Sequence, residues 1–277
     1  MELAPTPEQK ELQASARRFL EKEVTRERLA AWDRTAEGYD PDFWRSAAGL
    51  GWMGFSLAEA IGGQGASFLD HALLFEECGR ALAPPAISSA VVAARLLAFL
   101  GDDAPLLGAL ARGTEQAALA FAERMLTDPR RGTTRVEGGR LTGEKRYVRQ
   151  GVTADHVVVA ARDGDGVALL RVRASAPGVA RRELRTFGGD RQSIFTFEAV
   201  VPDAWLASGD QAADAIVRAR DEAAALALAD GVGGLERVLE TTVEYVKQRE
   251  QFGQPIGKFQ AVQFRCADMA TALAASR

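Results

Sequence analysis

The sequence predicts an α+β chain of several domains: an N-terminal α-helical domain, a middle β-barrel or β-sandwich domain, and an incomplete C-terminal helical bundle. Apolar residues recur with the helical period over about the first hundred residues. From about Ala117, glycine and arginine interrupt short β-rich runs, and the helical period returns after Gly209. Because the helical and β-rich stretches follow one another, we expect three domains, at residues 1–114, 115–207 and 208–277.

Start and stop signals predict the helices of the first domain. Thr6 to Gln9 has the order of a capping box, with proline in the first turn, so a helix starts there. Asp40-Pro41 repeats the signal, and Gly49 and Gly51 end that second helix. A third helix is expected over 68–82, before two prolines, and a fourth and a fifth between Ile87 and Ala111.

The middle of the chain has the composition of β-strands. The β-rich runs are residues 118–122, 140–148, 156–161, 167–172 and 194–201. In the last run Phe195, Phe197 and Ala199 alternate with more polar residues, which is the period of a strand buried on one face. The sequence therefore predicts a middle β-domain.

A long helix is expected from Gly209 to about Gln248. Leu228, Val232, Leu235 and Leu239 recur in it at alternating steps of four and three, the spacing of a bundle seam. A turn over 252–257 then leads into a last helix that runs to the end of the sequence. Two helices cannot close a bundle core alone, so we expect a partner surface.

Composition excludes several classes of protein. The 277 residues are 47% apolar, and 34 Lys and Arg against 38 Asp and Glu give a net charge of −4. No basic excess is present to bind nucleic acid or an anionic membrane. Two distant cysteines exclude a disulfide framework and a paired-cysteine zinc site, and the most apolar stretch is too short to span a bilayer. We expect a cytoplasmic protein with no metal, nucleic-acid or membrane partner.

Two apparent motifs have plainer explanations. Gly49-x-Gly51-x-x-Gly54 matches a dinucleotide fingerprint in letters, but it follows a predicted helix and lacks the strand-turn-helix context that its mechanism needs. His71 and His156 sit on a predicted helix and a predicted strand, where we expect no partner that would make either a catalytic base, and the nucleophile spacing of known triads is absent. We expect a structural polar role for both histidines.

The segment from Arg249 to Gln260 combines groups that suit a dinucleotide. Its guanidinium can pair with a pyrophosphate, an aromatic ring can stack on an adenine, and an amide can bind a further polar group. The alternative is a glycine-rich helical hairpin in which Phe252 fills a core. The residues alone leave both interpretations open.

At this turn the sequence resembles the acyl-CoA dehydrogenase family of flavoproteins. The residues that match its Tyr-x-x-x-Arg-x-x-Phe-Gly-x-x-Ile/Leu segment are Tyr245, Arg249, Phe252, Gly253 and Ile256. Residues 6–9, 58–65 and 76–80 resemble further segments of the family, and the domain order agrees. Residues 221–229 are similar to subunits that act on sterol side chains and often work as unlike pairs.

The resemblance implies FAD as cofactor, between the β-domain and the helical domains. In the β-domain it implies contacts from Phe121, Ala122, Glu123, Tyr147, Val148 and Arg149, with Tyr147 against the flavin ring. In the hairpin it implies contacts from Arg249, Gln251, Phe252 and Gln260 to the flavin of a neighbouring subunit. Ala122 and Arg149 depart from the family pattern, because both lack the usual hydroxyl.

The reaction implied is α,β-dehydrogenation of an acyl-CoA, in which a carboxylate removes the α-proton and flavin takes the β-hydrogen as hydride. One family position for that carboxylate falls on Ala223, and Ala224 stands where an arginine is usual. Glu222 is the nearest carboxylate, about 100° around the helix. Asp221 matches a family aspartate near the CoA portion, which implies substrate binding.

Three functions therefore stay open. The first is an FAD-dependent acyl-CoA dehydrogenase in a homo- or hetero-oligomer with another such chain, with an electron-transfer flavoprotein as acceptor. The second is a non-catalytic structural subunit of a heteromeric acyl-CoA dehydrogenase, favoured by the missing base and hydroxyls. The third is a flavin-dependent monooxygenase of the same fold.

Overall fold

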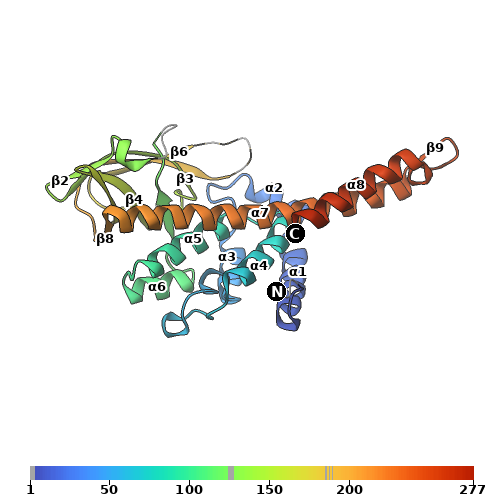
Figure 1. Ribbon diagram of the computed structural model, residues 1–277, viewed down its shortest axis with the longest axis horizontal. Coiled ribbons are helices and arrows are strands. Elements are labelled where there is room, and N and C mark those ends of the chain that lie inside the picture. The colour runs from blue at the N-terminus through green and yellow to red at the C-terminus, as the bar shows by residue number, and fades with distance from the viewer. Residues whose placement is uncertain (1–3, 124–127, 185, 187, 189) are drawn as a thin grey trace. The chain divides into compact units, whose positions relative to one another are not determined.

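The computed structural model describes residues 4–123, 128–184, 186, 188 and 190–277 (Figure 1). It confirms the fold class, with a helical N-terminal part, a central β-sheet and C-terminal helices. Contacts divide the chain into two compact units, here called unit 1 (residues 1–25, 69–83 and 225–277) and unit 2 (26–68 and 84–224). Each unit combines segments that are distant in the sequence, so this division does not test the three predicted domains. Their boundaries at residues 114 and 207 stay a prediction.

The N-terminal helices begin where their capping residues predict. The helical segments are α1 (Pro7–Glu23), α2 (Arg26–Trp32), α3 (Pro41–Gly49), η1 (Trp52–Gly54), η2 (Glu59–Ile61), α4 (Phe68–Ala81), α5 (Ala86–Phe99) and α6 (Ala104–Ala111). Thr6 and Gln9 form both bonds of the capping box of α1, at 3.3 and 3.0 Å. Asp40 caps α3 by accepting from the Phe43 amide at 2.7 Å.

Helix α2 depends on a contact that is distant in sequence. Its seven residues are too few for helical periodicity to show, and it was not predicted. In unit 2, the Arg191 guanidinium donates to the carbonyl oxygens of Trp32 and Thr35, at 3.2 and 2.9 Å. An arginine at the carbonyl end of a helix satisfies acceptors that the helix leaves open. The contact thus fastens α2 to the chain that enters β7 (Gln192–Val200).

The central sheet of unit 2 has eight strands, coloured green to orange in Figure 1. Besides β7 they are β1 (Ala117–Ala120), β2 (Arg135–Glu137), β3 (Arg140–Arg149), β4 (His156–Asp163), β5 (Gly166–Arg173), β6 (Val179–Leu184) and β8 (Ala204–Ser208). The order is β6-β7-β3-β2-β4-β5-β8, and β1 pairs with β4 in parallel. Strands β2, β6 and β8 were missed because β2 is three residues long, β6 is a largely exposed edge strand, and β8 is a five-residue strand at the other edge of the sheet.

A cluster of buried side chains packs on the sheet of the β-domain and includes Leu141, Val148 and Phe195. The alternation predicted for the last strand is confirmed, because Phe195 and Phe197 are buried while Thr196 and Glu198 are not. Burial of such aromatic side chains contributes roughly 1.5–3 kcal/mol each. This core holds β3 rigidly against β7, which matters for the site below.

The C-terminal part is a long helical hairpin. It comprises α7 (Gly209–Gln248), β9 (Glu250–Gln251), β10 (Gln254–Pro255), η4 (Ile256–Lys258) and α8 (Gln260–Ser276). In unit 1, α4 and α7 approach at two glycines: a Cβ on Gly79 would lie 1.8 Å from the Asp230 carbonyl oxygen, and one on Gly233 would lie 1.7 Å from that of Glu76. Only glycine permits backbones to approach this closely.

The two apparent motifs resolve as expected, with one correction. Gly51 is left-handed and follows α3 into a 3₁₀ turn, so no strand precedes the glycines. His71 is buried. His156 does have an acidic partner, Glu115, at 2.6 Å, contrary to the sequence-based expectation, because a residue 41 positions earlier gives no local signal. Within the described residues, no helix has the length and apolar character that crossing a membrane requires.

Candidate functional site

A β-bulge in β3 is the most unusual backbone feature of unit 2. The pairing of β3 with β7 changes register between Lys145 and Val148. Within this bulge Tyr147 has a φ of +57°, although it carries a large side chain, and its ring is 47% exposed. Left-handed backbone at such a residue costs on the order of 1–3 kcal/mol and clusters at functional sites. The bulge directs an aromatic ring to the surface.

The segment after β1 lies directly beside this bulge. The Arg146 amide donates to the Ala122 carbonyl oxygen at 2.9 Å. The Lys145 ammonium donates to the Phe121 carbonyl oxygen at 3.3 Å and to the Glu123 carboxylate at 2.7 Å. The structure therefore brings together two groups of predicted cofactor residues, 121–123 and 147–149, that are over twenty positions apart in the sequence.

The side chains of these six residues have different surroundings. Tyr147 and Arg149 are exposed, and Phe121 and Ala122 are half-buried. Val148 lies in the β-domain core, so it offers only its main chain to a ligand. The Arg149 guanidinium contacts the Asp190 carboxylate at 3.3 Å. An exposed aromatic ring with polar main chain beside it suits a planar, hydrogen-bonding ring system.

Glu123 faces inward and is ionised. Its carboxylate accepts from the Thr133 amide at 2.6 Å, from the Thr134 amide at 3.1 Å and from Lys145. Burial alone would raise the pKa of Glu123, but the Lys145 ammonium and the threonine donors outweigh it and hold the pKa at about 2. Burial also lowers the pKa of Lys145, against the attraction of the carboxylate. The Glu123 carboxylate is thus a structural group.

The adjacent acids of α7 differ sharply. Glu222 is held at two points by Arg95 of α5, with Nε to Oε2 and Nη2 to Oε1 both at 2.8 Å. Arg218, one turn earlier, adds a contact to Oε1 at 3.2 Å. Asp221 is exposed. Both oxygens of Glu222 therefore accept from the Arg95 guanidinium, which fixes the position of the carboxylate.

Arg95 is itself fixed by two further groups. Its Nη1 donates to the Ser56 hydroxyl at 2.5 Å, and its guanidinium lies 4.9 Å from the centre of the Phe68 ring. A guanidinium with a carboxylate, a hydroxyl and a ring face as neighbours has little freedom to move. The ion pair is therefore a rigid link between α5 and α7 within unit 2.

A small hollow lies beside this turn of α7, with a volume of about 180 Å³. Its floor is apolar and includes Val167 and Ile216, and three exposed charged residues, Arg130, Arg220 and Asp128, also line it. Such a combination suits an amphipathic anion, with its chain on the floor and its charges at the arginines. Among the described residues, no group of three His, Cys, Asp or Glu side chains could hold a metal ion.

The predicted hairpin residues lie together in unit 1. Gln251 and Gln254 are paired across β9 and β10, which leaves Phe252 and Gly253 as a two-residue loop. Both loop residues have positive φ, +56° and +78°, as a type I′ turn requires. Phe252 is 93% exposed, so the alternative in which its ring fills a core is wrong. The other predicted hairpin residues, Arg249, Gln251 and Gln260, are also exposed.

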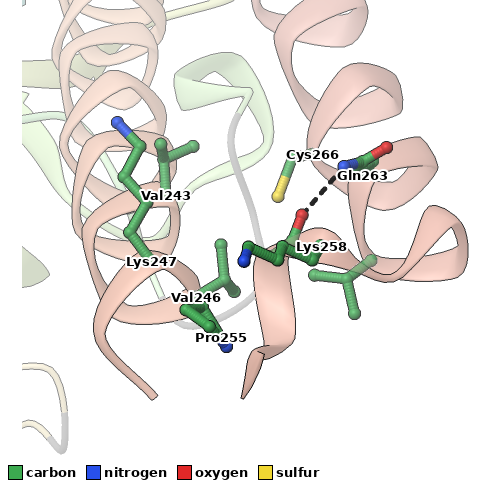
Figure 2. Close-up of a pocket in the computed structure, with 9 residues that line it drawn as sticks. Val243, Val246, Lys247, Pro255, Lys258, Gln263 and Cys266 are labelled. Atoms are coloured by element: carbon green, nitrogen blue, oxygen red, sulfur yellow. Dashed lines mark hydrogen bonds between the residues drawn. The ribbon is translucent and has the colours of Figure 1, made fainter. Parts of the chain in front are cut away.

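Figure 2 shows an apolar groove of about 450 Å³ between α7 and α8, next to this hairpin. The side-chain Nε2 of Gln263 donates to the Gly257 carbonyl oxygen at 2.9 Å, and this bond fixes the start of α8. The walls of the groove are Val243, Val246, Lys247, Pro255, Gly257, Lys258, Val262, Gln263 and Cys266. The groove exposes apolar side chains that a partner surface would cover.

Sequence reasoning missed the residues that hold the site residues in place. Lys145, Arg95 and Asp190 have no local signal, because each acts on a residue far away in the sequence or in another element. A fully buried lysine is rare without a partner, so a lysine inside an otherwise β-rich run was the one available signal.

Comparisons with known proteins agree with this arrangement. A family model described as the acyl-CoA dehydrogenase N-terminal domain matches residues 6–105, and one described as the C-terminal domain matches residues 214–277. The acyl-CoA dehydrogenase IpdE2 of Mycobacterium tuberculosis is 35% identical over 243 residues, which are 87% of this chain. The chain spans 64% of the length of that relative.

Solved structures show the same fold. A variant of the Tcur3481-Tcur3483 steroid ACAD is 32% identical with a TM-score of 0.86, over 96% of this chain and 74% of that one. The ChsE4-ChsE5 complex from Mycobacterium tuberculosis is 28% identical with a TM-score of 0.85, over 100% and 79%. A glutaryl-CoA dehydrogenase of Mycobacterium smegmatis solved with FADH2 shares the fold at 22% identity and a TM-score of 0.89, over 98% and 74%.

Proposed function

Because this chain belongs to the acyl-CoA dehydrogenase family, we propose that it holds FAD at the β3 bulge and takes part in the α,β-dehydrogenation of an acyl-CoA thioester. The observation that carries the proposal is the bond from the Arg146 amide to the Ala122 carbonyl oxygen, at 2.9 Å. This bond places Phe121 and Ala122 beside the exposed, left-handed Tyr147. Two chain segments that the family resemblance assigns to flavin thus form one surface.

The residues present suit the flavin ring. Tyr147 offers a ring face, and Phe121, Ala122 and Val148 offer main-chain groups, since the Val148 side chain is in the core. Arg149 adds a positive charge that Asp190 partly neutralises. When bound, FAD supplies the two-electron acceptor for the hydrogen that leaves the β-carbon of the acyl group. The glutaryl-CoA dehydrogenase solved with FADH2 supports this choice of cofactor at the level of the fold.

The hollow beside α7 supports an acyl-CoA as substrate. Its apolar floor suits a pantetheine arm, and the guanidinium groups of Arg130 and Arg220 suit the phosphates of CoA. Asp221 follows Arg220 directly and is exposed, so its carboxylate is available to accept a hydrogen bond from an amide of that arm. We assign substrate binding to Asp221 on this ground.

A non-catalytic subunit is the second candidate, favoured by one specific observation. Glu222 is the only carboxylate of α7 next to the position that the resemblance gives to a base, and both its oxygens are bound by Arg95. Ala223 and Ala224 carry no group that could remove a proton. In this alternative the chain supports a partner whose own residues perform the reaction; the ChsE4-ChsE5 structure is itself a complex of two differently named chains.

We further propose an oligomer with a second acyl-CoA dehydrogenase chain and an electron-transfer flavoprotein as acceptor. The exposed hairpin residues Arg249, Gln251, Phe252 and Gln260 would then contact the flavin of the neighbouring subunit. Exposure of Phe252 supports this role, since a ring 93% exposed at the tip of a strained turn has no part in the core of its own unit. A cytoplasmic location stays a prediction.

Anaerobic titration tests the proposal and separates the candidates. The purified chain is loaded with FAD, the unbound FAD is removed, and acyl-CoA thioesters of several chain lengths and ring types are added. Loss of the flavin absorption on addition of one of them indicates dehydrogenation by this chain. Retained flavin without loss of absorption contradicts dehydrogenation by this chain, and failure of the chain to retain flavin when it is expressed alone indicates the non-catalytic subunit. Failure to retain flavin with a co-purified partner chain as well contradicts the FAD site.

A further inference from the structure

Lys145 is the most deeply buried charged side chain of the sheet. It is 0% exposed, and its ammonium contacts the Glu123 carboxylate at 2.7 Å and the Phe121 carbonyl oxygen at 3.3 Å. Taking an ammonium group out of water costs several kcal/mol, and the attraction within a single ion pair rarely offsets that desolvation cost. Because burying the Lys145 ammonium costs this much free energy, its presence in the sheet is not explained by a contribution to stability alone.

The Glu123 carboxylate connects three segments of the chain. Besides Lys145 of β3, it accepts from the Thr133 amide and hydroxyl, at 2.6 and 2.9 Å, and from the Thr134 amide at 3.1 Å. Gly132 packs against it so closely that a Cβ there would lie 2.4 Å from Oε1. With donors on several sides and backbone against it, the carboxylate has one position available.

The pair lies next to the two segments assigned to flavin. Phe121 and Ala122 precede Glu123 directly, and Tyr147 follows Lys145 by two residues. The bond from the Arg146 amide to the Ala122 carbonyl oxygen lies between them. The left-handed backbone of Tyr147 persists only if its surroundings fix it, and the Lys145 side chain anchors the residue where the bulge begins.

We propose that Lys145 and Glu123 are positioning residues, which set the spacing between Phe121–Ala122 and Tyr147 and so shape the flavin surface. This proposal rests on the proposed function. The pair acts through the main chain and does not touch the flavin. Its loss lets the segment 121–123 separate from β3 and the bulge relax toward a regular strand, which moves the Tyr147 ring.

This role is separable from stability. Replacing a buried ion pair by neutral groups of similar volume is often neutral for the free energy of unfolding, whereas it removes a directional link. In the double variant Glu123→Gln/Lys145→Met, no unpaired charge is left, and the single amide oxygen of Gln can replace Oε2, which accepts from Thr133, but not also Oε1, which accepts from the Thr134 amide. The variant Glu123→Gln alone keeps the Lys145 donor and an amide oxygen that can accept from it, but it removes the counter-charge of the ammonium, so it weakens the link in part and also lowers the free energy of unfolding.

The matched control is a second buried ion pair of unit 2, Arg171 with Asp102, whose atoms Nε and Oδ2 are 2.8 Å apart. Both side chains are nearly as buried as the Lys145 pair, at 12% and 5% exposed. They link the turn before α6 to β5 and are not bonded to residues 121–123 or 145–149 by any contact described here. Asp102→Asn/Arg171→Met therefore removes a comparable pair elsewhere.

The test measures FAD affinity and hydrogen exchange in the apoprotein. We expect the double variant to keep its far-ultraviolet circular dichroism, to bind FAD about 10–100-fold more weakly, and to change the visible circular dichroism of the remaining flavin. Without flavin, the Arg146 amide should exchange about tenfold faster than in the parent protein. Glu123→Gln should lie between the two, and the Asp102/Arg171 control should match the parent.

The outcomes separate the two proposals. Parent-like FAD affinity, flavin dichroism and Arg146 exchange in the double variant overturn the positioning role while the proposed function stands. If the double variant does not fold, Glu123→Gln decides by the same three measurements. If the parent and the control both fail to bind FAD, the proposed function is wrong and the positioning role falls with it.

Discussion

The guanidinium of Arg95 binds the carboxylate of Glu222 at two points, each 2.8 Å long, and so joins α5 to α7. Arg220 and Asp221, the two residues that directly precede Glu222, are both exposed. Neighbouring acids on one helix therefore have different roles: Glu222 is a structural group, and Asp221 is free to meet a ligand. This difference can be measured directly.

Glu222→Gln should leave turnover within about twofold of the parent, whereas Asp221→Asn should raise the KM for acyl-CoA with little change in stability. Loss of half of a largely buried pair should lower the free energy of unfolding of Glu222→Gln by about 1–3 kcal/mol. Steady-state kinetics and urea unfolding check both variants. A loss of turnover of a thousandfold in Glu222→Gln, with flavin still bound, would identify it as the base after all.

Phe252 combines a left-handed backbone, which is unfavourable for a bulky residue, with an exposed side chain. Asparagine before glycine suits a type I′ turn better than phenylalanine, so Phe252→Asn should raise the free energy of unfolding by about 0.5–1 kcal/mol. If the ring contacts a flavin, the same variant should weaken FAD binding by about tenfold. Urea unfolding and FAD titration check the two effects, with Glu250→Gln as control. Unchanged FAD affinity in Phe252→Asn would remove the ring from the cofactor site.

Stability should fall in acid through Glu123. Its pKa lies at about 2 in the folded chain against an ordinary 4.5, so its stabilising contribution is complete above pH 4.5 and is lost as the pH falls toward 2. The loss amounts to about 2–3 kcal/mol. Urea unfolding of the parent and of Glu123→Gln at several pH values measures it. Asp40 titrates in the same range, so only the difference between the two proteins counts. If the free energy of unfolding changed with pH equally in the parent and in Glu123→Gln, that result would contradict the ion pair.

Exposed apolar residues of α7 predict a partner for unit 1. Leu228, Leu235, Val238 and Tyr245 recur at steps of seven and three on one face and are 52–72% exposed. A stripe of this kind on a soluble chain marks an interface. Sedimentation should find the parent larger than a monomer, alone or with a partner chain, and Leu235→Lys/Val238→Lys should dissociate it. Glu244→Lys on the same helix is the control, and a monomeric parent that binds no partner would contradict the interface.

Local signals predicted the elements that local forces determine. The Thr6–Gln9 capping box, the Asp40 cap and the long helix from Gly209 follow from neighbouring residues, and each is confirmed. Helix α2 and strand β6 depend on contacts with residues far along the chain, such as Arg191 and β7, so no pattern within them reveals them. The same limit explains why Glu115 was not foreseen as the partner of His156.

The candidate site shows the same division. The family resemblance supplied Tyr147, but not its left-handed backbone, because a bulge depends on the register between β3 and β7. Glu123 and Val148 are predicted cofactor contacts; in the structure the Glu123 carboxylate faces Lys145, and the Val148 side chain lies in the core. Whether a residue near a cofactor uses its side chain or its main chain is decided by the sheet, not by its type.

The visible absorption spectrum of the purified full chain, taken alone and with any chain that co-purifies with it, tests the central claim most directly. After gel filtration in the presence of added FAD, the account predicts the absorption bands of oxidised flavin on the protein peak, and weaker bands on the peak of the Glu123→Gln/Lys145→Met variant. A parent protein that elutes without flavin in both preparations, and whose addition leaves FAD fluorescence unchanged, would contradict it.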